Sequence, residues 1–366
     1  RGLLVTDWTY RSANAMARAV RERRIGCLEL LELHLERVRR HNTALNAIVV
    51  LDADRARARA READARIARG EFLGPLHGVP MTVKEAFDVA GLPTTWGVPA
   101  LRGNVASANA TSVGALLDAG AVIFGKTNVP LLLGDWQTFN AIHGTTNNPW
   151  DAARTPGGSS GGSAAALAAG MSALEMGSDI GSSIRNPAHY CGVYGHKPSF
   201  GIVPQHGHWI PGAHVPLDVL VCGPLARSAE DLALALDLIA GPEPFDRPAW
   251  TLKLPRPRKT ALGEFRIALI LDDPNCAVDR SVTDRIQAVA DAAARAGARV
   301  DDKARPRIDT LRAHALYLQL LRGATGALLS DDAYAQSRAK SAQLAPGDQS
   351  YGARVLRATA QDHRAW

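Results

Sequence analysis

The chain has 366 residues, of which 46% are hydrophobic and only 5% aromatic, and its formal net charge is +6 at pH 7. This length can build one large or two ordinary domains with a sizeable core, and the composition excludes a disordered or fibrous chain. The positive charge invites a nucleic-acid interpretation, but arginines and acids are interleaved in segments such as 55–69 (RARARAREADARIAR), which is typical of a solvated helix face. Because no stretch alternates basic and stacking aromatic residues, we expect no nucleic-acid partner.

Hydrophobic periodicity predicts secondary structure in chain order. Residues 12–40 are expected to form two helices separated near Gly26, and residues 53–69 a charged third helix that ends at Gly70. Short apolar strands then alternate with helices, which predicts an α/β fold. The expected strands are 79–83, 121–124, 172–176 and 265–271, and the expected helices are 112–119, 163–169, 228–240 and 279–296.

These patterns predict four segments. Residues 1–75 form an N-terminal helical segment that packs on the core, and residues 76–240 form that core and carry the catalytic site. Residues 241–264 are rich in proline and arginine and are expected to be a linker. Residues 265–366 are expected to be a further α/β and helical part of the same domain.

Cysteine and histidine spacing indicates neither a disulfide framework nor a metal site. The four cysteines, Cys27, Cys191, Cys222 and Cys276, form no Cys-x-x-Cys pair, and the histidines show no ligand spacing on a helix. We therefore expect a reduced, cytoplasmic protein without a metal or other cofactor. No apolar run reaches the ~20 residues of a membrane span, so no membrane partner is expected. The chain begins with Arg1, which leaves a removed targeting segment open.

Two glycine- and serine-rich segments carry the strongest chemical signal. Residues 155–163 read TPGGSSGGS, residues 177–188 read GSDIGSSIRNPA, and Lys84 ends an apolar segment upstream. Together they supply a hydroxyl nucleophile, a second hydroxyl, an amine base and a backbone whose N–H groups can converge because glycine lacks a side chain. A flexible linker is the weaker interpretation, since an alanine-rich helix follows at 164–169.

Two other motifs lack the context that they need. Residues 120–127 match the phosphate-binding pattern G-x-x-x-x-G-K-[ST], but their variable positions are expected to be a strand, and Pro130 interrupts the required helix. Residues 158–162 match the nucleophile elbow G-x-S-x-G, but the polar segment 151–156 precedes them instead of an apolar strand. We therefore favour neither nucleotide binding nor an α/β-hydrolase elbow.

The segment around Ser183 is expected to bind an anion. Small residues before it let the backbone curl its N–H groups toward one point, and we assign Ser183 as nucleophile and the N–H groups of Ile180, Gly181, Ser182 and Ser183 as the oxyanion hole. The alternative is that Ser183 only caps a following helix. Lys84 is the expected base, which requires burial to lower its pKa by several units from about 10.4.

From Lys84 to Pro204 the sequence resembles the amidase signature family of serine hydrolases. The resemblance implies a large mixed β-sheet flanked on both sides by α-helices, and a Ser-cisSer-Lys triad. It places the relay serine at Ser159, 24 residues before Ser183, with a cis peptide bond before it. Lys197 is another lysine of this region that could serve as the base. The resemblance assigns it instead to a turn that packs against the core.

The chain departs from the family at two points. Ser182 stands where the family often has glycine, and the chain ends at Trp366 on a polar helical segment. We therefore expect a C-terminal part of the fold to be missing.

Further residues are expected to support the site or contact the substrate. Asp179 and Arg185 flank the nucleophile loop and are expected to fix its backbone through buried hydrogen bonds, without taking part in proton transfer. Ser160 and Ser178 are expected to supply hydroxyl groups that support the catalytic residues. The candidates for the substrate pocket are Gly134, Asp135, Trp136, Gln137, Thr138, Gly158, His206 and Trp209.

The leading hypothesis is a hydrolase that cleaves the C–N bond of amides through an acyl-enzyme. Carbamates (urethanes), anilides and aryl esters are further candidate substrates. The chain would then resemble the aryl acylamidase-like or urethanase-like members of the family. Its partners would be a small-molecule amide or carbamate, and the chain would be a monomer or homodimer. A second class is an amidotransferase component that acts on misacylated tRNA. A non-catalytic binding protein is disfavoured, because binding alone has no use for Lys84, Ser159 and Ser183 together.

Overall fold

The computed structural model describes residues 7–210, 216–326 and 329–361. The chain divides into two compact units, Arg1–Leu252 and Lys253–Trp366. The first unit is built on a six-stranded sheet with the strand order β1-β3-β2-β6-β8-β7. Strands β3, β2 and β6 are parallel, whereas β1, β8 and β7 pair antiparallel with their neighbours. These strands are β1 (Ile48–Leu51), β2 (Pro80–Lys84), β3 (Val122–Thr127), β6 (Leu174–Asp179), β7 (Tyr194–Gly195) and β8 (Val221–Ala226).

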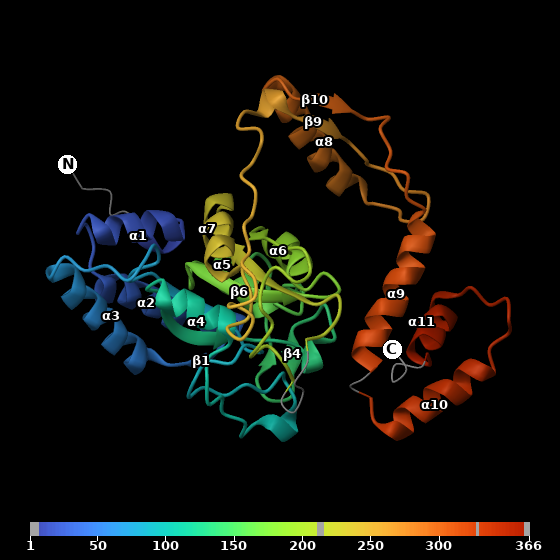
Figure 1. Cartoon of the computed structure of the whole chain (residues 1–366), viewed down its shortest axis with the longest axis horizontal. Helices are drawn as coiled ribbons and strands as arrows, with labels where there is room; N and C mark the ends of the chain where they lie inside the picture. Colours follow the sequence, from blue (N-terminus) through green and yellow to red (C-terminus); the bar gives the residue numbers. More distant parts are fainter. Residues whose placement is uncertain (1–6, 211–215, 327–328, 362–366) are drawn as a thin grey trace. The chain divides into compact units, whose positions relative to one another are not determined.

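Helices pack around this sheet (Figure 1). The α-helices of the first unit are α1 (Ala13–Arg21), α2 (Cys27–Leu45), α3 (Ala53–Ala68), α4 (Thr111–Asp118), α5 (Gly161–Ala168), α6 (Arg185–Cys191) and α7 (Ala229–Ile239). Short 3-10 turns lie at η1 (Trp8–Tyr10), η2 (Pro99–Leu101) and η3 (Leu131–Leu133), and a small hairpin is formed by β4 (Phe139–Asn140) and β5 (Gly144–Thr145).

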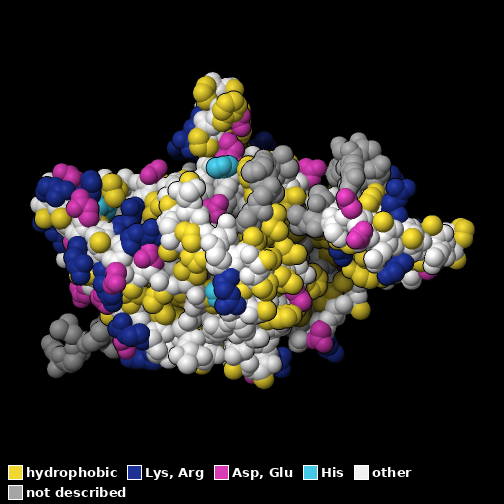
Figure 2. All heavy atoms as spheres, turned by 90° about the horizontal axis from the view of Figure 1, so that it is seen from below, with side chains coloured by type: hydrophobic (Ala, Val, Ile, Leu, Met, Phe, Trp, Pro, Cys, Tyr) yellow, Lys and Arg dark blue, Asp and Glu magenta, His cyan; other side chains and the backbone are white. Residues whose placement is uncertain are grey.

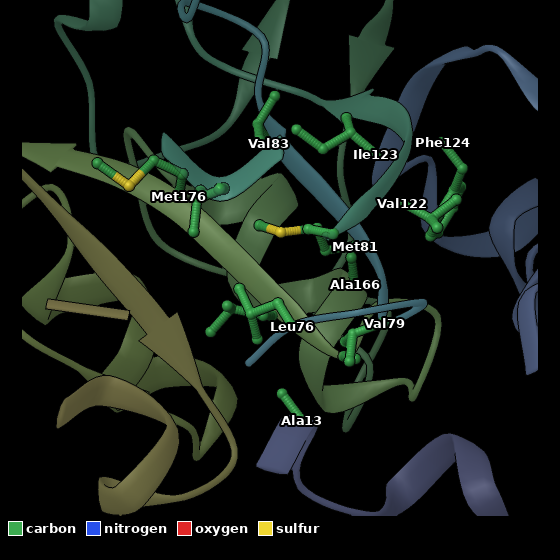
Figure 3. Close-up of a cluster of buried hydrophobic side chains, with 14 of the residues drawn as sticks. Ala13, Leu76, Val79, Met81, Val83, Val122, Ile123, Phe124, Ala166 and Met176 are labelled. Carbon is green, nitrogen blue, oxygen red and sulfur yellow. The ribbon is translucent and has the colours of Figure 1, made fainter. Parts of the chain in front are cut away.

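The core lies where β2, β3 and α5 meet, as Figure 3 shows for Met81, Phe124 and Ala166. Every residue of β2 is buried, as expected for a parallel strand that is covered on both faces. Helix α5 consists of glycine, serine, alanine and leucine, so its backbone can approach its neighbours closely. A Cβ on Gly162 would collide with the backbone of Asn128. This close packing sets the position of the segment that precedes α5.

The second unit combines a small α/β element with a helical part. Strands β9 (Arg266–Ala268) and β10 (Arg299–Asp301) pair in parallel and are connected by α8 (Arg280–Arg295), since parallel neighbours need a crossover. A short turn, η4 (Leu262–Glu264), precedes them. Helices α9 (Thr310–Gly326), α10 (Asp331–Ala342) and α11 (Tyr351–Thr359) follow and contact one another.

The mixed sheet with flanking helices confirms the predicted fold class. Most of the predicted elements are present within a few residues of their expected ends, but the strand expected at 265–271 is shorter, because β9 covers only Arg266–Ala268. The division of the chain at 241–264 stays a prediction. Among the described residues, no helix is long and apolar enough to span a bilayer.

Candidate active site

Three chain segments converge on the amine of Lys84. Lys84 is the last residue of β2 and is fully buried. Its Nζ donates to Ser159 Oγ at 2.7 Å and to Ser178 Oγ at 3.0 Å. Ser178 belongs to the neighbouring strand β6, and Ser159 lies two residues before α5. The sheet and the helix packed on it therefore bring an amine and two hydroxyls together.

Burial changes the ionisation of this amine. It lowers the pKa of Lys84 to about 7, although the nearby Asp179 carboxylate acts in the opposite direction. Removal from water disfavours the ammonium form, so a large fraction of Lys84 is neutral at neutral pH. A neutral amine has a lone pair that can accept a proton from a hydroxyl.

The segment before α5 lies against the segment that carries Ser183. The peptide bond between Gly158 and Ser159 is cis, as the family resemblance implies. The Ser160 N–H donates to Ser183 O at 3.1 Å, and the Ser160 hydroxyl lies 3.4 Å from Ser178 O. The two glycine- and serine-rich segments of the sequence are therefore neighbours in space.

Asp179 organises the turn that contains Ser183. One carboxylate oxygen accepts from the Ser182 N–H at 2.9 Å, and the other from the Ile184 and Arg185 N–H groups at 3.0 and 3.2 Å. The Arg185 guanidinium adds two further bonds, of 3.0 and 2.8 Å. Burial alone would raise the pKa of Asp179, but the Arg185 side chain and these N–H groups outweigh it and hold the pKa below its usual value. The expected supporting roles of Asp179 and Arg185 agree with this geometry.

These bonds reduce the number of N–H groups that are available for the proposed oxyanion hole. The Ser182 N–H is one of the four groups assigned from the sequence, but it donates to the Asp179 carboxylate. It is therefore not available to bind an oxyanion. Within the described part of the chain, the N–H groups of Gly181 and Ser183 donate no hydrogen bond. The proposed hole therefore rests on these two groups, and the contribution of the Ile180 N–H stays a prediction.

Ser182 occupies a backbone conformation that favours glycine. Its φ is +78°, a left-handed value that costs a residue with a Cβ roughly 1–2 kcal/mol. We expect Ser182→Gly to raise the free energy of unfolding by about 0.5–1 kcal/mol, because glycine escapes this strain but loses more entropy on folding. Urea unfolding measures the change. Ser228→Gly is the contrasting variant, since Ser228 has φ −143° and caps α7 by accepting from the Asp231 N–H. Glycine there gains no such relief and loses the cap, so the free energy of unfolding should fall; a gain equal to that of Ser182→Gly would contradict the explanation.

Seven of the eight predicted pocket residues fall into two groups, and the eighth, Gly158, forms the cis peptide bond with Ser159. Trp136 donates its indole N–H to Gly181 O at 2.8 Å, and the Thr138 hydroxyl donates to Gly157 O at 2.8 Å. Gly134 and Asp135 precede them, and the Gln137 N–H donates to the Asp135 carboxylate at 2.9 Å. The segment 134–138 thus contacts both serine-bearing segments.

His206 and Trp209 form the second group. Their rings pack on each other at 5.0 Å, and the His206 N–H donates to Glu243. His206 also lines a surface cavity of about 650 Å³ that contains none of the proposed catalytic residues. Among the described contacts, none joins His206 or Trp209 to the lysine or serines of the site, and their place in a substrate pocket stays a prediction.

His208 is a residue near the site that was not chosen from the sequence. It is buried against Phe87 and Trp96, with ring centroids 4.3 and 5.1 Å away. Burial, with a smaller effect of the nearby Lys84 charge, lowers its pKa to about 3. Such a group is a poor proton acceptor at neutral pH, which argues against a histidine base. No local pattern predicts its burial, because that burial depends on Phe87 and Trp96, which lie far from it in the sequence.

The competing lysines contact other parts of the protein. Lys126 lies within strand β3 and donates to Thr94 Oγ1 at 2.9 Å and to Pro93 O. The run that resembled a phosphate-binding loop is therefore a buried strand, as expected. Lys197 donates to Pro198 O at 2.9 Å. In the described residues, no group of three His, Cys, Asp or Glu side chains could hold a metal ion.

Comparison with known proteins identifies relatives over most of the chain. A model of the amidase family matches residues 29–358. A glutamyl-tRNA(Gln) amidotransferase component from Acidothermus cellulolyticus is 39% identical over 242 residues, which is 66% of this chain and 47% of that protein. The indoleacetamide hydrolase of Bradyrhizobium diazoefficiens is 39% identical over 304 residues, 82% of this chain and 57% of that protein.

Solved structures share the fold. A bacterial aryl acylamidase of the amidase signature enzymes family is 27% identical, with a TM-score of 0.74 over 96% of this chain and 72% of that one. The chain spans about half the length of the curated relatives it matches.

Proposed function

The chain belongs to the amidase signature family, and from this premise we propose that it hydrolyses the C–N bond of carboxylic amides through an acyl-enzyme on Ser183. One observation carries the proposal: a fully buried lysine with a pKa of about 7 lies 2.7 Å from a serine hydroxyl. A buried neutral amine bonded to a hydroxyl is suited to proton transfer, and activating a hydroxyl nucleophile is what acyl transfer requires.

The proposed reaction proceeds in two halves. Lys84 accepts the proton of Ser159 across their 2.7 Å hydrogen bond. Among the described hydrogen bonds none joins the Ser159 and Ser183 hydroxyls, so we propose that this bond forms in the reacting complex; there Ser159 accepts the proton of Ser183, and Ser183 Oγ attacks the amide carbon. The N–H groups of Gly181 and Ser183 stabilise the oxyanion. The C–N bond then breaks, and the amine leaves with the proton returned through Ser159. Water attacks the acyl-enzyme by the same relay and releases the carboxylic acid.

Amides are the substrate class best supported by the relatives, which include an indoleacetamide hydrolase and an aryl acylamidase. Carbamates, as in a urethanase, and aryl esters are proposed as further substrates, because their acyl carbons undergo the same attack. The purified chain should turn over an aryl amide such as an anilide, measured as release of the arylamine. Absence of turnover on aryl amides, carbamates and esters, together with absence of labelling by a fluorophosphonate, would end the proposal.

The second candidate is an amidotransferase component that acts on misacylated tRNA, favoured by the similarity to such a protein at 39% identity. On the face drawn in Figure 2, however, basic and acidic side chains are interspersed and form no continuous basic area. Together with the interleaved arginines and acids of residues 55–69, this arrangement supports our proposal that the chain has no nucleic-acid partner. We further propose that it is a cytoplasmic monomer or homodimer that acts alone. Turnover of simple amides without stimulation by tRNA, glutamine or ATP would separate the two candidates.

The proposed base predicts a pH profile. Below a pH of about 7, Lys84 is increasingly protonated, so kcat/KM should fall by about tenfold per pH unit and level off above the pKa. Initial rates between pH 5 and about 9 in buffers of constant ionic strength measure the profile. A flat profile, or one that falls as the pH rises through 7, would contradict Lys84 as the base.

A further inference from the structure

Trp136 is bonded to the nucleophile loop by its indole. The Nε1–H donates to Gly181 O at 2.8 Å, although 58% of the Trp136 surface is exposed. This carbonyl belongs to the same peptide unit as the Ser182 N–H, which donates to Asp179 Oδ1 at 2.9 Å. In a trans peptide unit, the C=O and N–H groups point in opposite directions. Trp136 and Asp179 therefore hold the two ends of one peptide unit.

The backbone of Trp136 is attached to the other catalytic segment. The Thr155 hydroxyl donates to Trp136 O at 3.2 Å. A Cβ on Gly158 would collide with Asp135 O and would lie 3.2 Å from the Trp136 backbone, so the two segments are in close contact next to the Gly158–Ser159 peptide bond. Trp136 thus spans from the segment that carries Ser159 to the loop that carries Ser183.

The orientation of the Gly181–Ser182 peptide unit matters for two reasons. The two N–H groups assigned to the oxyanion hole, those of Gly181 and Ser183, belong to the peptide units on either side of it, so a displacement of this unit would disturb the backbone that positions both. Moreover, Ser182 has a φ of +78°, which a residue with a Cβ adopts reluctantly. Strained backbone persists only where its surroundings hold it in place, and the indole hydrogen bond is part of that restraint.

We propose that Trp136 is a positioning residue for amide hydrolysis, acting through its indole N–H on the Gly181 carbonyl to keep the oxyanion hole in its reactive geometry. The inference rests on the proposed function. It differs from the sequence-based assignment of Trp136 to the substrate pocket, in which the ring surface would contact the substrate.

Trp136→Phe tests the proposal, because it removes the N–H and keeps an aromatic ring. Trp150→Phe is the matched control: the Trp150 indole also donates to a backbone carbonyl at 2.8 Å, but that carbonyl is Cys191 O at the end of α6, and the side chain is 74% exposed. We expect Trp136→Phe to lower both kcat on an aryl amide and the rate of fluorophosphonate labelling by about tenfold, because the loss of one hydrogen bond that positions the oxyanion hole should weaken transition-state stabilisation by about the strength of such a bond. KM and the Tm should change little, and Trp150→Phe should match the wild type.

The outcomes separate this inference from the proposed function. Equal rates for Trp136→Phe and wild type would overturn the positioning role. An increase in KM for large amides, with kcat and labelling unchanged, would also overturn it and assign the ring to substrate contact. If the wild-type protein itself showed neither turnover nor labelling, the proposed function would fail, and the positioning role would fail with it.

Discussion

Ser183→Ala is expected to lower amide turnover by about 10⁴-fold or more, since loss of a nucleophile removes the acyl-enzyme route and leaves only substrate binding and oxyanion stabilisation. The fold should stay intact, because in the described residues the Ser183 hydroxyl makes no hydrogen bond, whereas its backbone carbonyl still accepts from Ser160. Steady-state turnover and thermal unfolding, measured on the same preparation, check both expectations.

Ser199→Ala is the control for this substitution, because Ser199 is exposed and lies outside the proposed site. It should leave turnover within about twofold of the wild type. A folded Ser183→Ala protein that retained near-normal turnover would contradict the assignment of the nucleophile.

Lys84→Met should reduce kcat/KM nearly as much as Ser183→Ala does, because residues that work as one proton-relay unit are not additive. Methionine fills much of the volume of the lysine side chain but cannot accept a proton. The double variant of Lys84→Met and Ser183→Ala should be scarcely less active than either single variant. Turnover of the three proteins under identical conditions tests this expectation.

Lys126→Met is the matched control, because Lys126 is also a buried strand lysine whose pKa is lowered by burial, to about 8. It bonds Thr94 and Pro93 instead of the site serines. Its loss should lower stability and leave the turnover of the folded protein close to normal. If the Lys126 variant lost turnover while the Lys84 variant kept it, the base would have to be reassigned.

Local patterns in the sequence predicted the fold class, which the structure confirms, and they indicated the segments that carry the candidate site; the roles of the individual site residues stay predictions. Apolar runs predicted strands β2 and β3, and the short residues of 155–163 and 177–188 indicated close backbone packing. The contact of Lys84 with Ser159 was implied only by the family resemblance, and the contact of Lys84 with Ser178 was not predicted, because the three residues come from separate segments of the chain.

Other features depend on contacts that no local pattern encodes. The Ser182 N–H was expected in the oxyanion hole but donates to Asp179. This bond depends on how the backbone turns around the Asp179 carboxylate, which the residue types alone do not specify. The bond from the Trp136 indole to Gly181 and the burial of His208 next to Lys84 likewise join segments far apart in the sequence. These contacts lie at the site itself, where packing and hydrogen bonds fix the backbone.

The most direct test of the central claim is to locate the covalent adduct. The wild-type protein is incubated with a fluorophosphonate at about pH 8, where Lys84 is largely neutral, then digested and sequenced by mass spectrometry. The account predicts one adduct, on the peptide that contains Ser183, and its absence from Ser183→Ala and Lys84→Met. An adduct on Ser159 or on a serine outside the site, or equal labelling of the Lys84 variant, would contradict it.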